Sequence, residues 1–119
     1  MSNVTESLDR LMELAGARSA ALVDSETGMV LGHAGSDAEL DVTAAANTEV
    51  VRAQLKIIGA LGSDDVIDDI LITLSTQYDI VRPLAAKPSI FLYLAMDKSK
   101  SNLALARHTV AECERQLEL

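Results

Sequence analysis

The sequence has few cysteines, aromatic residues and cations for its 119 residues. Its single cysteine, Cys113, cannot form an internal disulfide or a paired-cysteine metal site, and a reducing compartment suits it. Tryptophan is absent, and two tyrosines and one phenylalanine offer no platform on which nucleic-acid bases could stack. Ten basic residues against 18 acidic ones give a net charge of −8, which disfavours a phosphate backbone or an anionic membrane surface as partner.

The sequence also lacks any apolar run long enough to cross a bilayer. Its first residues, MSNVTESLDR, carry acids rather than the basic and apolar regions of a signal peptide. We therefore expect a cytoplasmic protein with no membrane insertion and no nucleic-acid partner. The length predicts one domain over residues 1–119, and a hydrophobic content of 49% is enough for an aliphatic core.

A stretch without proline, from Leu40 to Leu61, organises the rest of the chain. Its length predicts a helix roughly 30 Å long. At about 100° per residue, its apolar side chains fall into two stripes instead of one. The first stripe consists of Leu40, Ala44, Val51, Leu55 and Ile58, and the second of Val42, Ala46, Val50, Ala53, Ile57, Ala60 and Leu61.

Two apolar stripes predict that this helix contacts two surfaces. One surface is the sheet of its own domain, and the other is either a groove in that domain or a second copy of the protein. We favour a second copy, because a chain this short has little else to form a groove and because alanines let helices approach closely. The pattern leaves open which stripe faces inward.

The remaining segments predict five strands and two further helices. Helical spacing indicates helices over 4–15 and from about 103 nearly to the C-terminus, and apolar runs indicate strands over 19–24, 29–33, 67–74, 78–84 and 90–96. The candidate helix caps are Asn3, then Ser36 or Asp37, then Ser99 or Ser101. Because the strand at 90–96 is apolar on both faces, helices should cover both sides of a mainly antiparallel sheet. The expected fold class is α+β, a three-layer α/β/α sandwich of order α-β-β-α-β-β-β-α.

This order of elements resembles the roadblock / dynein light chain domain family, in its bacterial-type single-domain form. AALVDSETGMVLG resembles the first hairpin of the family, ILITLSTQYDIVRPLA its third and fourth strands, and FLYLAMDKSKSNLALAR its last strand, loop and helix. The resemblance covers about residues 4–118. It implies a profilin-like/roadblock fold with a five-stranded antiparallel sheet, the long helix on one face and the two terminal helices on the other.

The resemblance also implies a homodimer, or a heterodimer with a paralogue. In such dimers the long helices pack together, and the edge strands, here around 70–75, join into one sheet. The expected interface residues are Ala46, Val50, Ala53, Ile57, Ile70 and Ile72. Bacterial members of the family often work with small Ras-like GTPases, sometimes as GTPase-activating partners, and the family has no catalytic signature. The resemblance therefore implies a regulatory or scaffold protein that is not an enzyme.

No set of residues in the sequence has the spacing of a metal site. His33 and His108 are the only histidines and have no neighbouring ligands at the usual spacing. The acidic cluster of Asp64, Asp65, Asp68 and Asp69 lacks the alternating ligands and central glycine of a calcium loop. We interpret it as a solvated turn, or as an acidic patch for a basic partner.

The other candidates also have structural interpretations. Cys113 lies on the apolar stripe of the last helix and should pack in the core, and Arg82 and Lys87 should be solvated charges. Three glycines near residue 30 form no phosphate-binding loop, so we expect no cofactor and no nucleotide. A small-ligand sensor is the alternative function, although an aliphatic core with almost no buried polar residues argues against it. An enzyme ranks last, because the acids lie mostly in turns and on helix surfaces.

Overall fold

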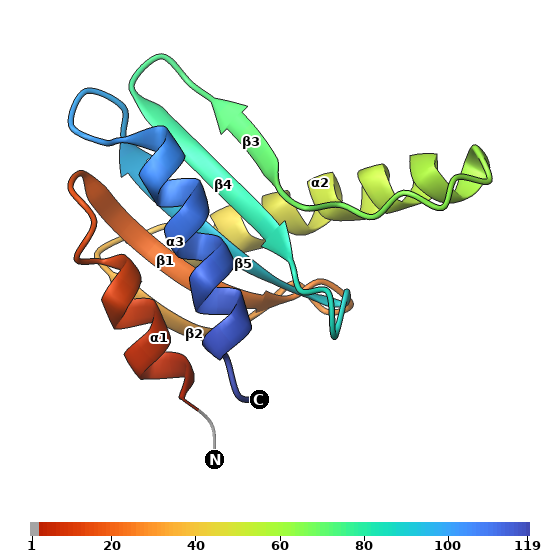
Figure 1. Cartoon of the computed structure of the whole chain (residues 1–119), viewed down its shortest axis with the longest axis horizontal. Helices are drawn as coiled ribbons and strands as arrows, with labels where there is room; N and C mark the ends of the chain where they lie inside the picture. The colour runs from red at the N-terminus through yellow and green to blue at the C-terminus, as the bar shows by residue number, and fades with distance from the viewer. Residues whose placement is uncertain (1–2) are drawn as a thin grey trace.

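The structure, a computed structural model, describes residues 3–119. Its elements follow the predicted order (Figure 1). They are α1 (Val4–Leu11), β1 (Ala17–Asp24), β2 (Met29–Gly35), α2 (Leu40–Ala60), β3 (Ile70–Thr73), β4 (Gln77–Pro83), β5 (Ile90–Asp97) and α3 (Leu103–Gln116). The predicted α+β class and element order are confirmed.

The five strands form one sheet in the order β2-β1-β5-β4-β3, and every neighbouring pair is antiparallel. Strand β5 lies at the centre, and all its residues but the last are buried. Its alternate side chains enter two different apolar clusters: Leu92 and Leu94 lie on one side of the sheet, Phe91 and Tyr93 on the other. The expected burial of this strand on both faces is therefore confirmed.

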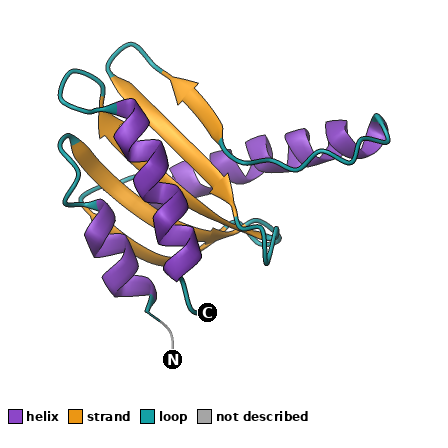
Figure 2. Ribbon diagram, viewed as in Figure 1, coloured by secondary structure: helices purple, strands orange, loops and turns teal. Residues whose placement is uncertain are grey.

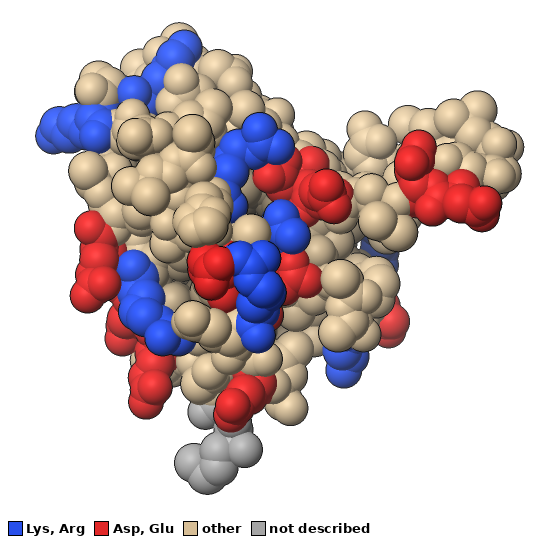
Figure 3. All heavy atoms as spheres, viewed as in Figure 1, with Lys and Arg blue, Asp and Glu red and all other residues tan. Residues whose placement is uncertain are grey.

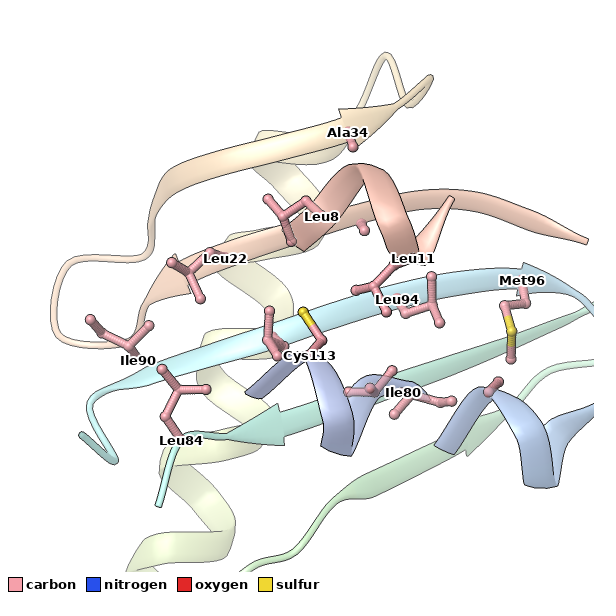
Figure 4. Packing of buried hydrophobic residues seen from close by; sticks show 14 residues of the cluster. Leu8, Leu11, Leu22, Ala34, Ile80, Leu84, Ile90, Leu94, Met96 and Cys113 are labelled. Carbon is pink, nitrogen blue, oxygen red and sulfur yellow. The ribbon is translucent and has the colours of Figure 1, made fainter. Parts of the chain in front are cut away.

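Helices α1 and α3 cover one face of the sheet, and α2 crosses the other (Figure 2). Leu8 and Leu11 of α1 and Val110 of α3 pack with Leu22, Leu94 and other residues in the larger cluster (Figure 4). The smaller cluster lies under α2 and includes Ala44 and Val51 of that helix. The three-layer α/β/α sandwich predicted from the sequence is confirmed.

Gly32 of β2 allows α1 to lie directly on the sheet. A Cβ atom at this position would stand 2.8 Å from Val4 Cγ1 and 3.5 Å from Leu8 Cδ1 of α1. Beside it the pairing of β1 with β2 shifts register between Leu22 and Val23, as at a β-bulge. The glycine that weakens the strand in the sequence therefore has a packing role in the fold.

Two element boundaries differ from the sequence prediction. Helix α1 ends at Leu11 instead of residue 15, because the chain continues in successive turns in which the N–H of residue i+3 donates to the carbonyl of residue i. Gly16, with φ of +81°, then leads into β1. Strand β3 covers Ile70–Thr73 instead of 67–74. The residue before it, Asp69, accepts hydrogen bonds from Arg107 on α3.

The predicted cap residue is right at α1, where Asn3 is the N-cap, and wrong at α2 and α3. Asn3 precedes α1, but its side chain bonds the backbone at the end of α3. Helix α2 begins after Glu39 without a side-chain cap, and Asp37 instead accepts from the N–H of Glu39. At α3 the cap is Asn102, whose Oδ1 accepts from the N–H of Leu105 at 3.0 Å. Cap position depends on where helical φ and ψ begin, which neighbouring polar residues do not fix.

Candidate functional site

The first stripe of α2 faces the sheet. Ala44 and Val51 are buried, and Leu40 packs against the same apolar cluster. Asn47 and Thr48 are buried beside them, and their side chains donate to the carbonyls of the preceding turn at 3.1 and 2.8 Å. These bonds satisfy the polar groups within the helix itself, which is what allows this face to be buried. The sequence left open which stripe faces inward, and the structure shows that it is the first one.

The second stripe of α2 faces away from the sheet. Ala46 and Ala53 are exposed, Val50 is half-buried, and Ile57 keeps 50% of its surface accessible. The four α2 residues predicted for a dimer interface thus lie on the outer side of the helix. Exposed apolar side chains in a row on one helix favour a protein–protein contact, because scattered surface residues would not share a face.

Helix α2 extends well beyond the sheet that it covers. Residues 52–66, which we call the arm, comprise the second half of α2 and the start of the loop that returns beside it (Figure 1). Leu55 belongs to the first stripe, which faces the sheet, but it is exposed because the sheet ends before it. Leu61 and Val66 are 75% and 82% exposed. The arm therefore presents apolar surface that the described part of its own chain does not cover.

Strand β3 provides the second part of the predicted interface. Among the described residues 3–119 it pairs only with β4, so its other edge carries backbone groups that no described strand pairs. Ile70 packs against the cluster under α2, and Leu71 packs against the opposite cluster. Ile72 is half-buried and alternates with Leu71, so Ile70 and Ile72 lie on the α2 side of the sheet. The fold thus brings all six predicted residues to one side, while their contact with a partner stays a prediction.

An apolar groove of about 210 Å³ lies where the arm leaves the body of the molecule. Leu55 and Ile58 of α2 form one wall, and Pro83 at the end of β4 and Leu84 after it form the other. Acidic side chains lie along the projecting part of the molecule, as Figure 3 shows on one face. Asp64 and Asp65 are both exposed there. The acidic cluster of the sequence is therefore divided, since Asp69 lies at the start of β3 and is held by Arg107.

The histidines do not come together in the fold. His33 lies on β2, in a hollow with Asp37 and Asp41, and His108 lies on α3 with Glu112 at 4.0 Å. Within residues 3–119, no group of three or more His, Cys, Asp or Glu side chains could hold a metal ion. None of the described helices is long and apolar enough to cross a membrane.

Cys113 packs in the core cluster of α1 and α3, as predicted (Figure 4). Its Sγ lies 3.7 Å from the carbonyl oxygen of Ser7. Burial raises the pKa of the thiol to about 11, although nearby Arg10 lowers it slightly. A thiol with this pKa stays protonated at neutral pH, so it is a poor nucleophile.

Arg82 is not the solvated charge expected from the sequence. Its Nε donates to Glu114 Oε1 of α3 at 2.5 Å, and the two side chains are only 20% and 13% exposed. Lys87 is exposed, as expected. The contact joins residues far apart in the sequence, so no local pattern could reveal it.

A polar group in the smaller core cluster was not expected from the sequence. Asp79 of β4 is buried, and its Oδ1 lies 3.4 Å from the hydroxyl of Tyr93 on β5. Ser19 and Asn47 are buried on the same side of the sheet, which corrects the expectation of almost no buried polar residues. One signal could have revealed it: Asp79 falls on the same side of its strand as the buried Val81.

Comparison with known proteins identifies the architecture. No protein-family model matches the sequence, and no curated protein sequence matches it. Among solved structures, the Roadblock/LC7 domain from Streptomyces avermitilis is similar with a TM-score of 0.79 and 16% identity, over 92% of this chain and 90% of that one. MglB from Myxococcus xanthus is similar with a TM-score of 0.81 and 18% identity, over 94% of this chain and 89% of that one. A structure described as MglB with tetrameric arrangement is similar with a TM-score of 0.76 and 21% identity, over 92% of this chain and 80% of that one.

These similarities extend over nearly the whole chain at low sequence identity, so they report on the architecture. They agree with the strand order, the three layers and the placement of the helices described above. The resemblance found in the sequence is thereby confirmed for the fold. This chain is a domain with the Roadblock/LC7 fold.

Proposed function

We propose that the chain, as one roadblock-like domain over residues 1–119, is a non-catalytic regulatory or scaffold protein that works as a dimer. Its partner is a small Ras-like GTPase or a signalling complex built around one. The observation that carries the proposal is the arm together with the outward stripe of α2. Both present apolar surface that the described part of the chain leaves uncovered, and covering such surface is the usual source of association free energy.

The proposed dimer has two-fold symmetry. The α2 helices pack antiparallel through Val50, Ala53 and Ile57, so that each arm lies over the first half of the partner helix. The small alanines at 46 and 53 permit close helix approach, as the stripe suggested. The two β3 edges pair and extend the sheet through both copies, which satisfies their free backbone groups. A symmetric interface of this kind closes, so it gives a dimer and not a fibre.

Several observations support self-association and regulation. One solved structure with this fold is described as having a tetrameric arrangement. Roadblock-type proteins, which the sequence resembles, often partner small GTPases. In that role the dimer would be a rigid platform for the switch loops of the GTPase. It would favour one of their conformations by the difference in its affinity for the two states.

The first test is the solution mass by light scattering. We expect the wild type to be a dimer and Val50→Asp/Ile57→Asp to be a folded monomer, because two buried charges would have no partners at the interface. Leu105→Asp is the control: Leu105 is exposed on α3, away from α2, so this variant should remain dimeric. A monomeric wild type would contradict the proposal.

The second test addresses the GTPase. A small Ras-like GTPase from the same organism should bind the dimer, and its rate of GTP hydrolysis should change when the dimer is added. The monomeric double variant should bind less well and have less effect. If the dimer neither binds this GTPase nor alters its rate of GTP hydrolysis, the proposed dimer would still stand, but the proposal that a GTPase is its partner would be wrong.

A further inference from the structure

A polar hollow of about 380 Å³ lies on the α2 face of the sheet, at the start of α2. Its floor is one row of residues across three strands: Ser19 of β1 is in register with Ala95 of β5, and Ala95 is in register with Asp79 of β4. Ala95 has only a methyl group, so the row is low in the middle and polar at both ends. Tyr93 stands at one end of this floor, and Thr43 lines the hollow from α2.

The two polar residues of the floor are deeply buried but incompletely bonded. Ser19 is 2% exposed and Asp79 is 8% exposed. Asp79 accepts both of its side-chain hydrogen bonds on Oδ1, from Gln77 Nε2 at 2.7 Å and from the Tyr93 hydroxyl at 3.4 Å. Within residues 3–119, Asp79 Oδ2 and Ser19 Oγ have no hydrogen-bond partner. Neither atom is completely inaccessible to solvent. Their remaining accessible surface therefore faces the hollow that they line.

The hollow has an excess of negative charge. Three carboxylates line it, those of Asp37, Glu39 and Asp79, against the single guanidinium of Arg18. Arg18 is already engaged and does not contact Asp79: Nη1 donates to Gln77 Oε1, on the lining of the hollow, at 2.7 Å, and Nη2 lies 3.6 Å from Asp97 Oδ2. Asp79 itself has no ion-pair partner in the described part of the chain. A buried carboxylate without a cation is unfavourable, so the site is suited to a cation from outside.

The geometry selects the kind of cation. A metal ion would lack ligands, because no three metal-ligating side chains of residues 3–119 converge. A bidentate guanidinium contact would use both carboxylate oxygens, and Asp79 offers only Oδ2, so the site gives a guanidinium no advantage over a single-point cation. An ammonium group has three donors, which match Asp79 Oδ2, Ser19 Oγ and one carboxylate at the start of α2. Its alkyl chain would lie against Leu74 and Ala95.

We propose that this hollow is a binding site for a primary ammonium group, carried either by a small free amine or by a lysine side chain of a partner protein. Asp79 is the charged anchor, and Ser19 and the start of α2 orient the group. None of the six named interface residues lines the hollow, although Leu74 belongs to the edge segment, and the proposal does not depend on the proposed function. Its volume also falls within the range of small-ligand pockets, as the alternative sensor function requires.

Calorimetric titration of the full chain tests the proposal with two probes, putrescine and Nα-acetyl-lysine amide. We expect saturable binding of at least one probe, with one site per chain. Asp79→Asn should weaken that binding by about tenfold or more, because it removes the charge that the ammonium contacts. Asp64→Asn is the matched control, since Asp64 is exposed in the loop after α2, and it should bind as the wild type does.

The two probes separate the two sources of the ammonium group. Binding of putrescine alone assigns the site to a free amine, and binding of the lysine derivative alone assigns it to a lysine side chain. If neither probe binds saturably at millimolar concentration, or if Asp79→Asn binds as well as the wild type, the proposal is wrong. Should Asp79→Asn fail to fold, amide chemical-shift mapping of the wild type decides. Shifts must then centre on Ser19, Asp79 and Ala95, and shifts centred elsewhere overturn the site.

Discussion

Glu114 of α3 holds Arg82 of β4 with one carboxylate oxygen and the backbone N–H of Ala85 with the other, at 2.5 and 2.6 Å. Helix α3 and the chain leaving β4 are thereby joined through one side chain. The ion pair is largely shielded from water, so it is screened less than a surface pair. Its loss would leave a guanidinium and an N–H without their partner.

Glu114→Ala should lower the free energy of unfolding by about 2 kcal/mol, because it leaves Arg82 without its counter-charge in a shielded position. Glu112→Ala is the control: Glu112 forms only more exposed pairs, with His108 and Arg115 on the same helix, and its loss should cost below about 0.5 kcal/mol. Urea denaturation of both variants measures the difference. Equal losses would show that shielding does not strengthen the Arg82 pair.

Two glycine substitutions should have opposite effects on stability. Gly35 has φ of +84°, and a Cβ there would stand 2.4 Å from the carbonyl oxygen of Arg18, so Gly35→Ala should cost roughly 2 kcal/mol or more. Gly59 lies in α2, where an added Cβ would meet nothing within 4 Å, so Gly59→Ala should stabilise by about 0.5–1 kcal/mol. Thermal unfolding followed by circular dichroism compares them. A stabilising Gly35→Ala would contradict the close contact.

Stability should decline in alkaline solution from about pH 9. Burial raises the pKa of the Cys113 thiol from its usual 9.0 to about 11. Between these values the unfolded chain releases a proton that the folded chain retains, so unfolding becomes more favourable as pH rises. Burial, and then Asp79 and Asp37, also raise the pKa of Tyr93 above its usual 10.0, which adds to the decline above pH 10.

Urea denaturation of the wild type and of Cys113→Ala at several pH values between 8 and 10 separates these contributions. Below pH 10 the variant should show a flatter dependence of unfolding free energy on pH, because the group that titrates there is absent. The variant will be less stable at every pH, since it loses buried sulfur, so the slope and not the absolute value is the readout. Parallel slopes for the two proteins would rule out Cys113 as the titrating group.

Hydrogen–deuterium exchange should distinguish the two halves of α2. In the monomeric Val50→Asp/Ile57→Asp variant, amides of residues 53–61 should exchange much faster than those of 43–51. The reason is that only the first half packs on the sheet. In the wild-type dimer the arm should be protected to a similar degree as the first half. An arm that exchanges equally fast in both proteins would show that no second copy covers it.

Much of the fold could be predicted from the sequence, because its signals are local and periodic. Alternating side chains in the strand at 90–96 required a helical layer on each side. The two stripes of α2 predicted two contacts, of which the structure shows the one with the sheet. Helix caps and strand ends could not be predicted well. They depend on which backbone groups find partners, as when Asn3 bonds the end of α3 and leaves its own helix without a side-chain cap.

The candidate sites likewise differ in whether local sequence spacing or only tertiary contacts could reveal them. Spacing alone grouped the apolar residues of α2 into two stripes, since one helix fixes their common faces, but it left open which stripe faces outward. The hollow around Asp79 could not be predicted from spacing, because Ser19, Ala95 and Asp79 come from three separated strands and meet only through the register of the sheet. The Arg82–Glu114 pair likewise joins a strand to a helix 32 residues later.

The sequence by itself determined the layers, the order of elements and the presence of two apolar stripes on α2, because hydrophobic periodicity acts along the chain. Only the tertiary structure decided that the first stripe faces the sheet and that the second half of α2 extends beyond it. That outcome depends on how far the sheet reaches under the helix. It also depends on which residues are small enough for close packing, and both properties arise from pairings between distant segments.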